Sequence, residues 1–265
     1  MTTGSTLLLV AHGSRDPRHA ATVTDLAALV RAQRPDLPVE VGYLDHCAPR
    51  IPQVLESLGG RPVAPPGEPA APAWFRDQVV AIPLLLNHAF HARSDIPAVL
   101  AEAASRQHGL TVRQGAVLGP SPLLLDALDR RLAEAGVRPS ARTGVVLAAA
   151  GSSDPAANAV TREVAADWQR TRGWGAVEVA HASAAPPRVA DAVAALRARG
   201  LTDIAVAPYL LAPGLLPDRI AAEASAAGVD TVAAPLGATP ELARLLLRRH
   251  DEALRTATRR ASLAA

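Results

Sequence analysis

The stretch Leu9–Pro17 reads LVAHGSRDP, and 138 residues later the stretch Leu147–Pro155 reads LAAAGSSDP. The same offset aligns Val39–Ile51 with Val177–Val189, which share a Val-Glu-Val triplet and a later Pro-Arg pair. Two matches at one offset indicate an internal repeat. The chain of 265 residues therefore contains two copies of one unit, and each copy has the length of a small domain.

The two copies differ in length at two places. A third match, between Ile82–Leu86 and Ala207–Leu211, has an offset of 125, so the first copy carries 13 extra residues before it. Residues 61–73 read RPVAPPGEPAAPA there, which is too rich in proline for a helix or a central strand and predicts a loop insertion. At a fourth match the offset has fallen to 118, so the first copy carries seven more residues. They lie in or near NHAFHARSDIP, residues 87–97. The first copy is thus longer around its histidines.

Within each copy, short apolar runs rich in β-branched residues alternate with amphipathic segments of helical period. Strands are predicted at 6–11, 38–43, 78–86 and 111–117 in the first copy, and at 144–149, 176–181, 203–210 and 230–234 in the second. Helices are predicted at 18–33, 49–58, 95–107 and 121–135, between the strands of the second copy, and from about residue 239 onwards.

This alternation predicts an α/β fold of two tandem similar domains, each a small parallel sheet with helices on both faces. Residues 138–142 contain Pro139 and Ser140 and are the expected junction. We therefore expect an N-terminal domain over residues 1–137, with the insertion at 61–73, and a C-terminal domain over residues 143–265. A ligand cleft is expected between the two domains.

Composition excludes several classes of protein. Apolar residues make up 49% and charged residues 20%, which is typical of a folded globular chain. The formal net charge of +2 is too small for the basic surface of a nucleic-acid binder. Cys47 is the single cysteine, which excludes an internal disulfide and a site built on several thiolates. No apolar run approaches the roughly 20 residues of a membrane span, so we expect a soluble cytoplasmic protein.

Candidate functional residues follow the strands of the first copy, since ligands of open parallel sheets bind beyond the carboxyl ends of the strands. His12 follows the first predicted strand, Asp45 and His46 follow the second, and His88 and His91 follow the third. A single histidine at a strand end is often structural, through a local hydrogen bond. Histidines from three separate loops at one sheet edge leave a structural and a functional role equally open.

The second copy serves as an internal control for these residues. The alignment places Ala150 opposite His12, Ser183 opposite Asp45, and Leu215 or Leu216 opposite His91, although the Gly-Ser and Asp-Pro pairs of the first loop are retained. If the imidazoles only stabilised the fold, the second copy would need them too. The pattern therefore predicts one metal site per chain, in the first copy.

Three stretches of the first copy carry a resemblance to a known family. They are LLLVAHGSRDP at 7–17, VGYLDHCAPRIPQVLESL at 41–58 and IPLLLNHAFHARSDIPAVL at 82–100. The chain resembles the sirohydrochlorin chelatases, the class II tetrapyrrole chelatases of the CbiX/SirB type, in their long form with two similar halves. The resemblance covers most of the chain.

The resemblance implies roles for individual residues. His12 and His91 would be the catalytic residues, binding the incoming divalent metal and taking up the pyrrole protons. Asp45 stands where many relatives have Glu and is a further candidate metal ligand. His88 stands where relatives usually have a small residue; it is either an auxiliary metal ligand or a side chain that faces solvent or the cleft wall. The expected contacts to the substrate carboxylates come from Ser14, Arg15 and Arg93. Arg50 has a counterpart in Arg188, which favours a structural role at a helix start.

Chelation fits these residue types. Metal insertion removes two protons from pyrrole nitrogens, and neutral imidazoles near physiological pH are suitable bases and ligands. Imidazole binds Fe²⁺, Co²⁺, Ni²⁺ and Zn²⁺ alike, so the ligand type does not select among these metals. We expect a chelatase that inserts Fe²⁺ or Co²⁺, with Ni²⁺ as a further candidate, into sirohydrochlorin or a related tetrapyrrole for sirohaem or cobalamin synthesis.

The sequence also bears on cofactors and on two rival functions, a carrier and a hydrolase or phosphatase. The chain lacks a Walker-A loop and a G-x-G-x-x-G motif after its first strand, so no nucleotide and no cofactor beyond the metal substrate is expected. A non-catalytic carrier of metal or tetrapyrrole remains an alternative with the same histidines. A hydrolase or phosphatase is disfavoured because Gly13-Ser14 does not form a G-x-S-x-G elbow and Ala11 occupies the arginine position of an Arg-His-Gly signature. Since the two copies supply both faces of a cleft, we expect a monomer that binds neither nucleic acid nor membrane.

Overall fold

The computed structural model describes residues 5–59, 78–87, 95–107 and 110–263. These residues form two compact units. The first unit comprises the described residues of Met1–Arg15, Val23–Leu118 and Ala243–Ala265. The second unit comprises Asp16–Thr22 and Gly119–Leu242. The predicted insertion at 61–73 lies outside the described residues. No helix in the described ranges is long and apolar enough to cross a membrane.

The first unit contains a sheet of four parallel strands in the order β2-β1-β3-β4. Strand β1 is central and buried over six of its seven residues, as expected of a parallel strand covered on both faces. The strands are β1 (Ser5–Ala11), β2 (Val39–Tyr43), β3 (Gln78–Pro83) and β4 (Thr111–Gln114). All four predicted strands are confirmed, although β3 and β4 each end three residues earlier than predicted.

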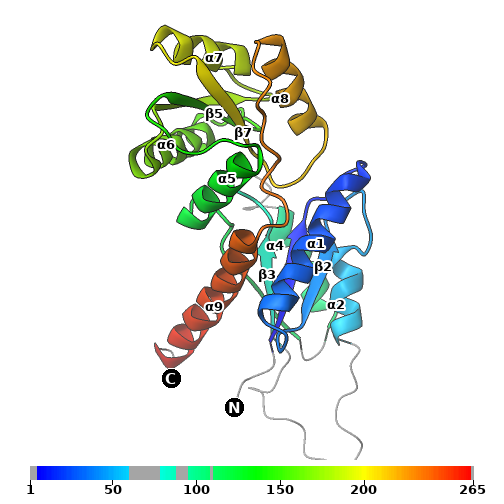
Figure 1. The fold of residues 1–265 in the computed structure, drawn as a ribbon. Helices are drawn as coiled ribbons and strands as arrows, with labels where there is room; N and C mark the ends of the chain where they lie inside the picture. The colour runs from blue at the N-terminus through cyan, green and yellow to red at the C-terminus, as the bar shows by residue number, and fades with distance from the viewer. Residues whose placement is uncertain (1–4, 60–77, 88–94, 108–109, 264–265) are drawn as a thin grey trace, which may run out of the picture. The chain divides into compact units, whose positions relative to one another are not determined.

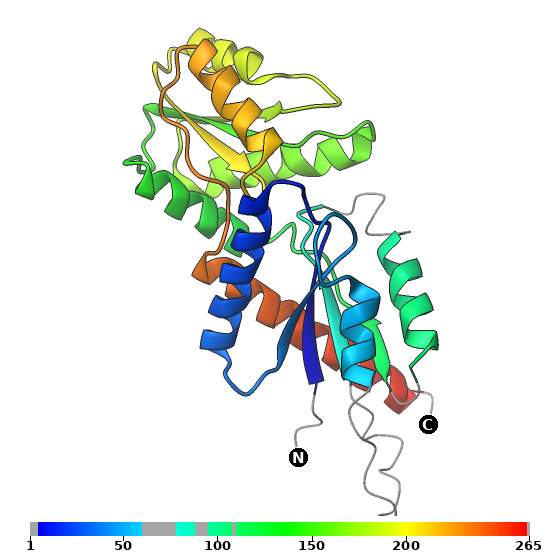
Figure 2. The same ribbon diagram turned by 90° about the vertical axis from the view of Figure 1, so that its right-hand side faces the viewer.

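Helices cover both faces of this sheet (Figures 1 and 2). Ile51 and Leu55 of α2 pack with Ile96 of α4 against Leu8 and Val10 of β1. Helix α1 and the final helix, α9, lie on the opposite face. The helices of this sheet are α1 (Pro17–Gln33), α2 (Ile51–Gly59), α4 (Asp95–Ser105) and α9 (Pro240–Leu263).

The second unit contains a sheet of three parallel strands in the order β6-β5-β7. They are β5 (Thr143–Ala149), β6 (Ala176–His181) and β7 (Asp203–Tyr209). The predicted strand at 230–234 is wrong, because only an isolated bridge joins Val232 to Val206 of β7. Two backbone hydrogen bonds hold this segment against β7. Pro235 follows directly and has no N–H with which to continue the ladder.

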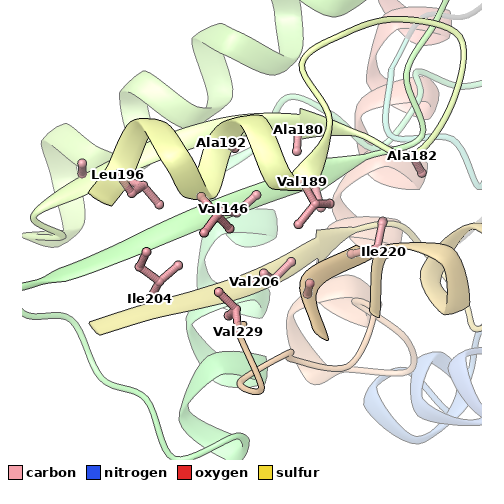
Figure 3. Packing of buried hydrophobic residues seen from close by; sticks show 14 residues of the cluster. Val146, Ala180, Ala182, Val189, Ala192, Leu196, Ile204, Val206, Ile220 and Val229 are labelled. Atoms are coloured by element: carbon pink, nitrogen blue, oxygen red, sulfur yellow. The ribbon is translucent and has the colours of Figure 1, made fainter. Parts of the chain in front are cut away.

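Helices α7 (Val189–Ala198) and α8 (Leu215–Ala226) pack on one face of this sheet around Val146 and Val206 (Figure 3). The other described helices of the unit are α5 (Pro122–Glu134) and α6 (Pro155–Arg172). A hydrogen bond links these two helices: Trp168 of α6, which is fully buried, donates from Nε1 to Asp129 Oδ1 of α5 at 2.8 Å.

The compact units differ from the predicted domains 1–137 and 143–265 in their terminal helices and in residues Asp16–Thr22, which belong to the second unit. Helix α5 ends the first repeat in sequence and belongs to the second unit, whereas α9 ends the second repeat and belongs to the first unit from Ala243 onwards. On α9, Asp251 accepts two hydrogen bonds from Arg34 at 2.7 and 2.8 Å, and His250 Nε2 lies 3.2 Å from Ser5 Oγ of β1. Amphipathic periodicity identifies the apolar face of each helix but not the sheet that buries it.

Candidate metal and proton-transfer site

The loop after β1 is held against the loop after β2 by a backbone hydrogen bond and by a hydrogen bond from a side chain. Asp45 N donates to His12 O at 2.8 Å, and Cys47 Sγ donates to Ser14 O at 3.2 Å. Gly13 has a φ of +90°, and a Cβ atom there would lie 1.7 Å from Asp45 O. Glycine is therefore required at this point, and its small size brings His12 and Asp45 to one sheet edge.

The loop after β2 has an unusual backbone. His46 has a φ of 61°, in the left-handed region that non-glycine residues seldom adopt, and the Ala48–Pro49 peptide bond is cis. The Asp45 carboxylate stabilises this conformation, because its Oδ1 accepts a hydrogen bond from His46 N at 2.8 Å. Cys47 N donates to Asp45 O at 2.7 Å and closes the turn.

This geometry places a second imidazole beside His12. The ring centroids of His12 and His46 are 6.4 Å apart with an angle of 34° between the ring planes. His46 Nε2 lies 3.4 Å from Asp45 Oδ2, and His12 Nδ1 lies 3.4 Å from Gly13 O. The sequence places His46 directly after the second strand but assigns it no role, because the family resemblance covers His12, Asp45, His88 and His91 alone.

Asp45 is half-exposed and is held as a carboxylate. The backbone N–H of His46 and the Arg50 guanidinium, 2.9 Å from Oδ1, lower the pKa of Asp45 below its usual value. Arg50 Nη1 also donates to Leu44 O at 2.5 Å, and Arg188 Nη1 donates to His181 O in the second repeat. The structural role expected for Arg50 is thus supported by its counterpart.

The remaining predicted residues are described only in part. Arg15 is exposed, and Ser14 is half-buried, with its carbonyl oxygen accepting the hydrogen bond from the Cys47 thiol. His88, His91 and Arg93 lie outside the described residues. Among the residues that are described, no group of three or more His, Cys, Asp or Glu side chains is arranged to hold a metal ion.

The second repeat has the same loop backbones without the imidazoles. A Cβ atom on Gly151 would lie 2.2 Å from Ser183 O, Ser183 N donates to Ala150 O at 2.9 Å, and the Pro186–Pro187 bond is cis. Ala184 has a φ of 61°, like His46. The loops therefore form without a histidine at either position.

His181 is the only histidine that the second repeat places close to these loops in the described structure. It ends β6, is 1% exposed, and its Nδ1 lies 3.1 Å from Pro186 O. Because it is buried and bonded to the backbone, its geometry is that of a structural histidine at a strand end.

The family model CbiX matches residues 6–135 and 144–253, one match for each repeat. The chain belongs to the CbiX family. It is 28% identical over 209 residues to a sirohydrochlorin ferrochelatase of Priestia megaterium, which covers 77% of this chain and 72% of that relative. A sirohydrochlorin cobaltochelatase of the same organism is 25% identical over 77% of this chain and 63% of its own length.

Solved structures share the fold. SirB from Bacillus subtilis with Fe³⁺ matches with a TM-score of 0.77 and 24% identity, over 94% of this chain and 95% of that one. SirB of a Bacillus subtilis subspecies in complex with cobalt matches with a TM-score of 0.70 and 22% identity, over 94% of each chain. The expected family and its chelatase-like α/β fold of two parallel sheets are therefore confirmed.

Proposed function

We propose that this protein inserts a divalent metal ion, Fe²⁺ or Co²⁺, into sirohydrochlorin or a closely related tetrapyrrole, for sirohaem or cobalamin synthesis. One observation carries the proposal: an exposed histidine, His12, lies at the carboxyl edge of a parallel sheet with its backbone bonded to that of Asp45, whereas Ala150 occupies the matching place in the second repeat. The imidazole is thus not needed for the loop, and a chemical role accounts for its presence.

The reaction requires a base for the pyrrole protons and a metal ligand that releases its ion. His12 is exposed, so its imidazole can exchange protons with solvent and with substrate. His91 is the second base and ligand in this proposal. The Asp45 carboxylate, ionised and oriented by Arg50, adds negative charge that favours a divalent cation at this edge. Open coordination lets the ion leave for the macrocycle, whereas a closed set of four ligands would retain it.

Substrate recognition in this proposal depends on arginine. Sirohydrochlorin carries many carboxylates, and a guanidinium binds carboxylate with two parallel hydrogen bonds. Arg15 is exposed on the loop that follows β1, three residues after His12. Arg15, Arg93 and Ser14 are the proposed contacts to these carboxylates. The metal is a substrate here, and the reaction as proposed needs no nucleotide or other cofactor.

Anaerobic absorption spectroscopy tests the proposal. Purified protein is mixed with sirohydrochlorin and Fe²⁺, Co²⁺ or Ni²⁺, and metal insertion is followed against the spontaneous rate. We expect insertion well above that rate with Fe²⁺ or Co²⁺. Tight binding of metal or tetrapyrrole without faster insertion would contradict the proposal and favour a carrier.

A further inference from the structure

A serine, a histidine and an aspartate of the first unit lie in line at the amino end of β1. Ser5 begins the strand, and its Oγ lies 3.2 Å from Nε2 of His250 on α9. The other ring nitrogen, Nδ1, lies 3.1 Å from Asp251 Oδ1. A hydroxyl, an imidazole and a carboxylate at these distances and in this order have the arrangement of a catalytic triad. The length of β1, roughly 20 Å, separates them from His12 at the other end of the strand.

The partners of His250 determine which of its nitrogens carries the proton. Arg34 donates to both oxygens of Asp251 and lowers the pKa of that carboxyl to about 2, so Asp251 is an ionised acceptor. Nδ1 is therefore the donor to Asp251, and Nε2 of the neutral ring accepts the hydrogen bond from the Ser5 hydroxyl. Burial lowers the pKa of His250, which is 2% exposed, and thus favours the neutral ring. A neutral imidazole with its lone pair on a hydroxyl is the state that a general base requires.

The second repeat holds the equivalent hydroxyl without an imidazole. The offset of 138 aligns Ser5 with Thr143, which begins β5. Thr143 Oγ1 donates directly to Asp203 Oδ2 at 2.6 Å, and Thr143 is buried. A carboxylate is thus sufficient to hold a hydroxyl at this strand start. In the first repeat an imidazole lies between the hydroxyl and the carboxylate, and Ser5 is half-buried, so part of it is in contact with solvent.

The packing of the terminal helix does not require the imidazole either. The offset of 118 aligns His250 of α9 with Leu132 of α5, which is fully buried. Leucine fills such a position without polar atoms that need hydrogen-bond partners, whereas a buried imidazole must have its nitrogens paired. Packing alone would therefore favour an apolar residue at position 250, and a chemical role accounts for the histidine.

We propose that Ser5 is an activated nucleophile that takes an acyl or phosphoryl group from a reactive donor such as an activated ester, with His250 as its general base and Asp251 as the residue that positions the imidazole. Ser5 Oγ forms a bond to the carbonyl carbon or to phosphorus, and the leaving group departs with the electron pair of the bond that breaks. The hydroxyl proton passes to His250 Nε2 and then to solvent. Attack by water on an acyl group would return the free serine and complete hydrolysis. This activity is independent of the proposed chelatase function.

Diisopropyl fluorophosphate tests the nucleophile, because a serine activated by a base displaces its fluoride. The full-length protein is treated without metal or tetrapyrrole, and labelled residues are located by peptide mass spectrometry. We expect Ser5 to be labelled about a hundredfold faster than Ser105. Ser105 is the control because it is exposed but its hydroxyl donates only to Glu102 O, so accessibility alone predicts the opposite order. Equal rates at the two serines, or no label on Ser5, would overturn the proposal.

Transfer of an acyl group is followed with p-nitrophenyl acetate. The chain contains no lysine, so side-chain amines do not compete for this ester. We expect p-nitrophenolate to be released faster by the wild-type protein than by Ser5→Ala, either as one equivalent per chain or continuously. Equal release by the two proteins would show that Ser5 does not react with esters.

His250→Leu tests the base with the residue that α5 has at the equivalent place. Because Leu132 is buried there, the variant should fold, as circular dichroism can verify. We expect the rate of Ser5 labelling to fall about a hundredfold, as for loss of a general base. A folded variant that is labelled at the wild-type rate would contradict the role of His250.

Asp251→Asn tests the positioning residue. Among the described residues, the charged groups that act on His250 are Asp251 and Arg34. Without the carboxylate, Nδ1 is no longer fixed as the donor and the imidazolium loses a negative neighbour. We expect labelling of Ser5 to slow about tenfold or more, and the midpoint of its pH profile to move to lower pH. A purely structural role of Asp251 would leave both unchanged. Since the buried ring is intact in this variant, it also decides the proposal if His250→Leu does not fold.

Discussion

His46 and Ala184 have the same left-handed backbone conformation, each with a φ of 61°, at equivalent places after the second strand of the two repeats. Each is followed by a cis peptide bond before proline. The loop backbone is thus shared, while the imidazole is present in one repeat. Substitution of the imidazoles should therefore affect binding and rate, and substitution of residues that the backbone requires should affect stability.

Replacing His12 by alanine should slow chelation by about a hundredfold or more, as expected for loss of a positioned base or ligand. The fold should be retained because Ala150 occupies the equivalent position on the same backbone. We expect the same loss of rate for His91→Ala. Initial rates of anaerobic metal insertion, with circular dichroism as the control for folding, measure the effect. Folded variants with wild-type rates would remove these two residues from the site.

Replacing Gly13 by alanine should destabilise the first unit by roughly 2 to 4 kcal/mol, because the left-handed conformation and a steric clash both oppose it. The added Cβ would lie 1.7 Å from Asp45 O, so the two loops would have to separate. Gly136→Ala is the matched control, since Gly136 has a φ of +84° with no atom within 4 Å of an added Cβ. Its cost should be about 1 kcal/mol. Urea unfolding of both variants measures the difference, and equal costs would contradict the steric argument.

The ion pair between Arg34 and Asp251 should make stability depend on acid pH. The guanidinium lowers the pKa of Asp251 from 3.8 to about 2. Because the pKa is lower in the folded state, the stabilisation is complete above about pH 4 and is lost as the pH falls towards 2.

Asp251 is 35% exposed, so screening by solvent reduces the expected contribution to about 1 kcal/mol. Asp251→Asn should lower the free energy of unfolding by about this amount at pH 7, and the difference from wild type should shrink between pH 4 and pH 3. Urea unfolding at these three pH values is the measurement. A difference that stays constant with pH would show that the charge of Asp251 contributes nothing.

Neither repeat should fold stably by itself. A fragment of residues 1–137 lacks α9, whose Leu245 and Leu246 are fully buried, and a fragment of residues 143–265 lacks α5, whose Leu124 and Leu132 are fully buried. Each fragment would expose an apolar surface that the intact protein buries. We expect non-cooperative thermal unfolding of each fragment and a cooperative transition when the two are expressed together. A cooperative transition in either fragment alone would contradict the helix exchange.

The repeat, the parallel strands and the chemical candidates could be predicted from the sequence. Apolar runs determine β1 and β5 locally, because a strand covered on both faces must be apolar throughout. The residues after those runs, His12 among them, then lie at the carboxyl edge of a sheet. The strand predicted at 230–234 has a shorter and more polar pattern, DTVAA, and only Val232 pairs there.

Only the tertiary structure decided which sheet buries each terminal helix and which imidazole lies beside His12. The apolar faces of α5 and α9 are visible in the sequence, but the sheet that buries each of them depends on contacts between residues more than a hundred positions apart. The approach of His46 to His12 likewise depends on a left-handed backbone angle and on the lack of a side chain at Gly13. Sequence periodicity reports local conformation and the direction of burial, whereas these juxtapositions are set by long-range packing, which no local pattern encodes.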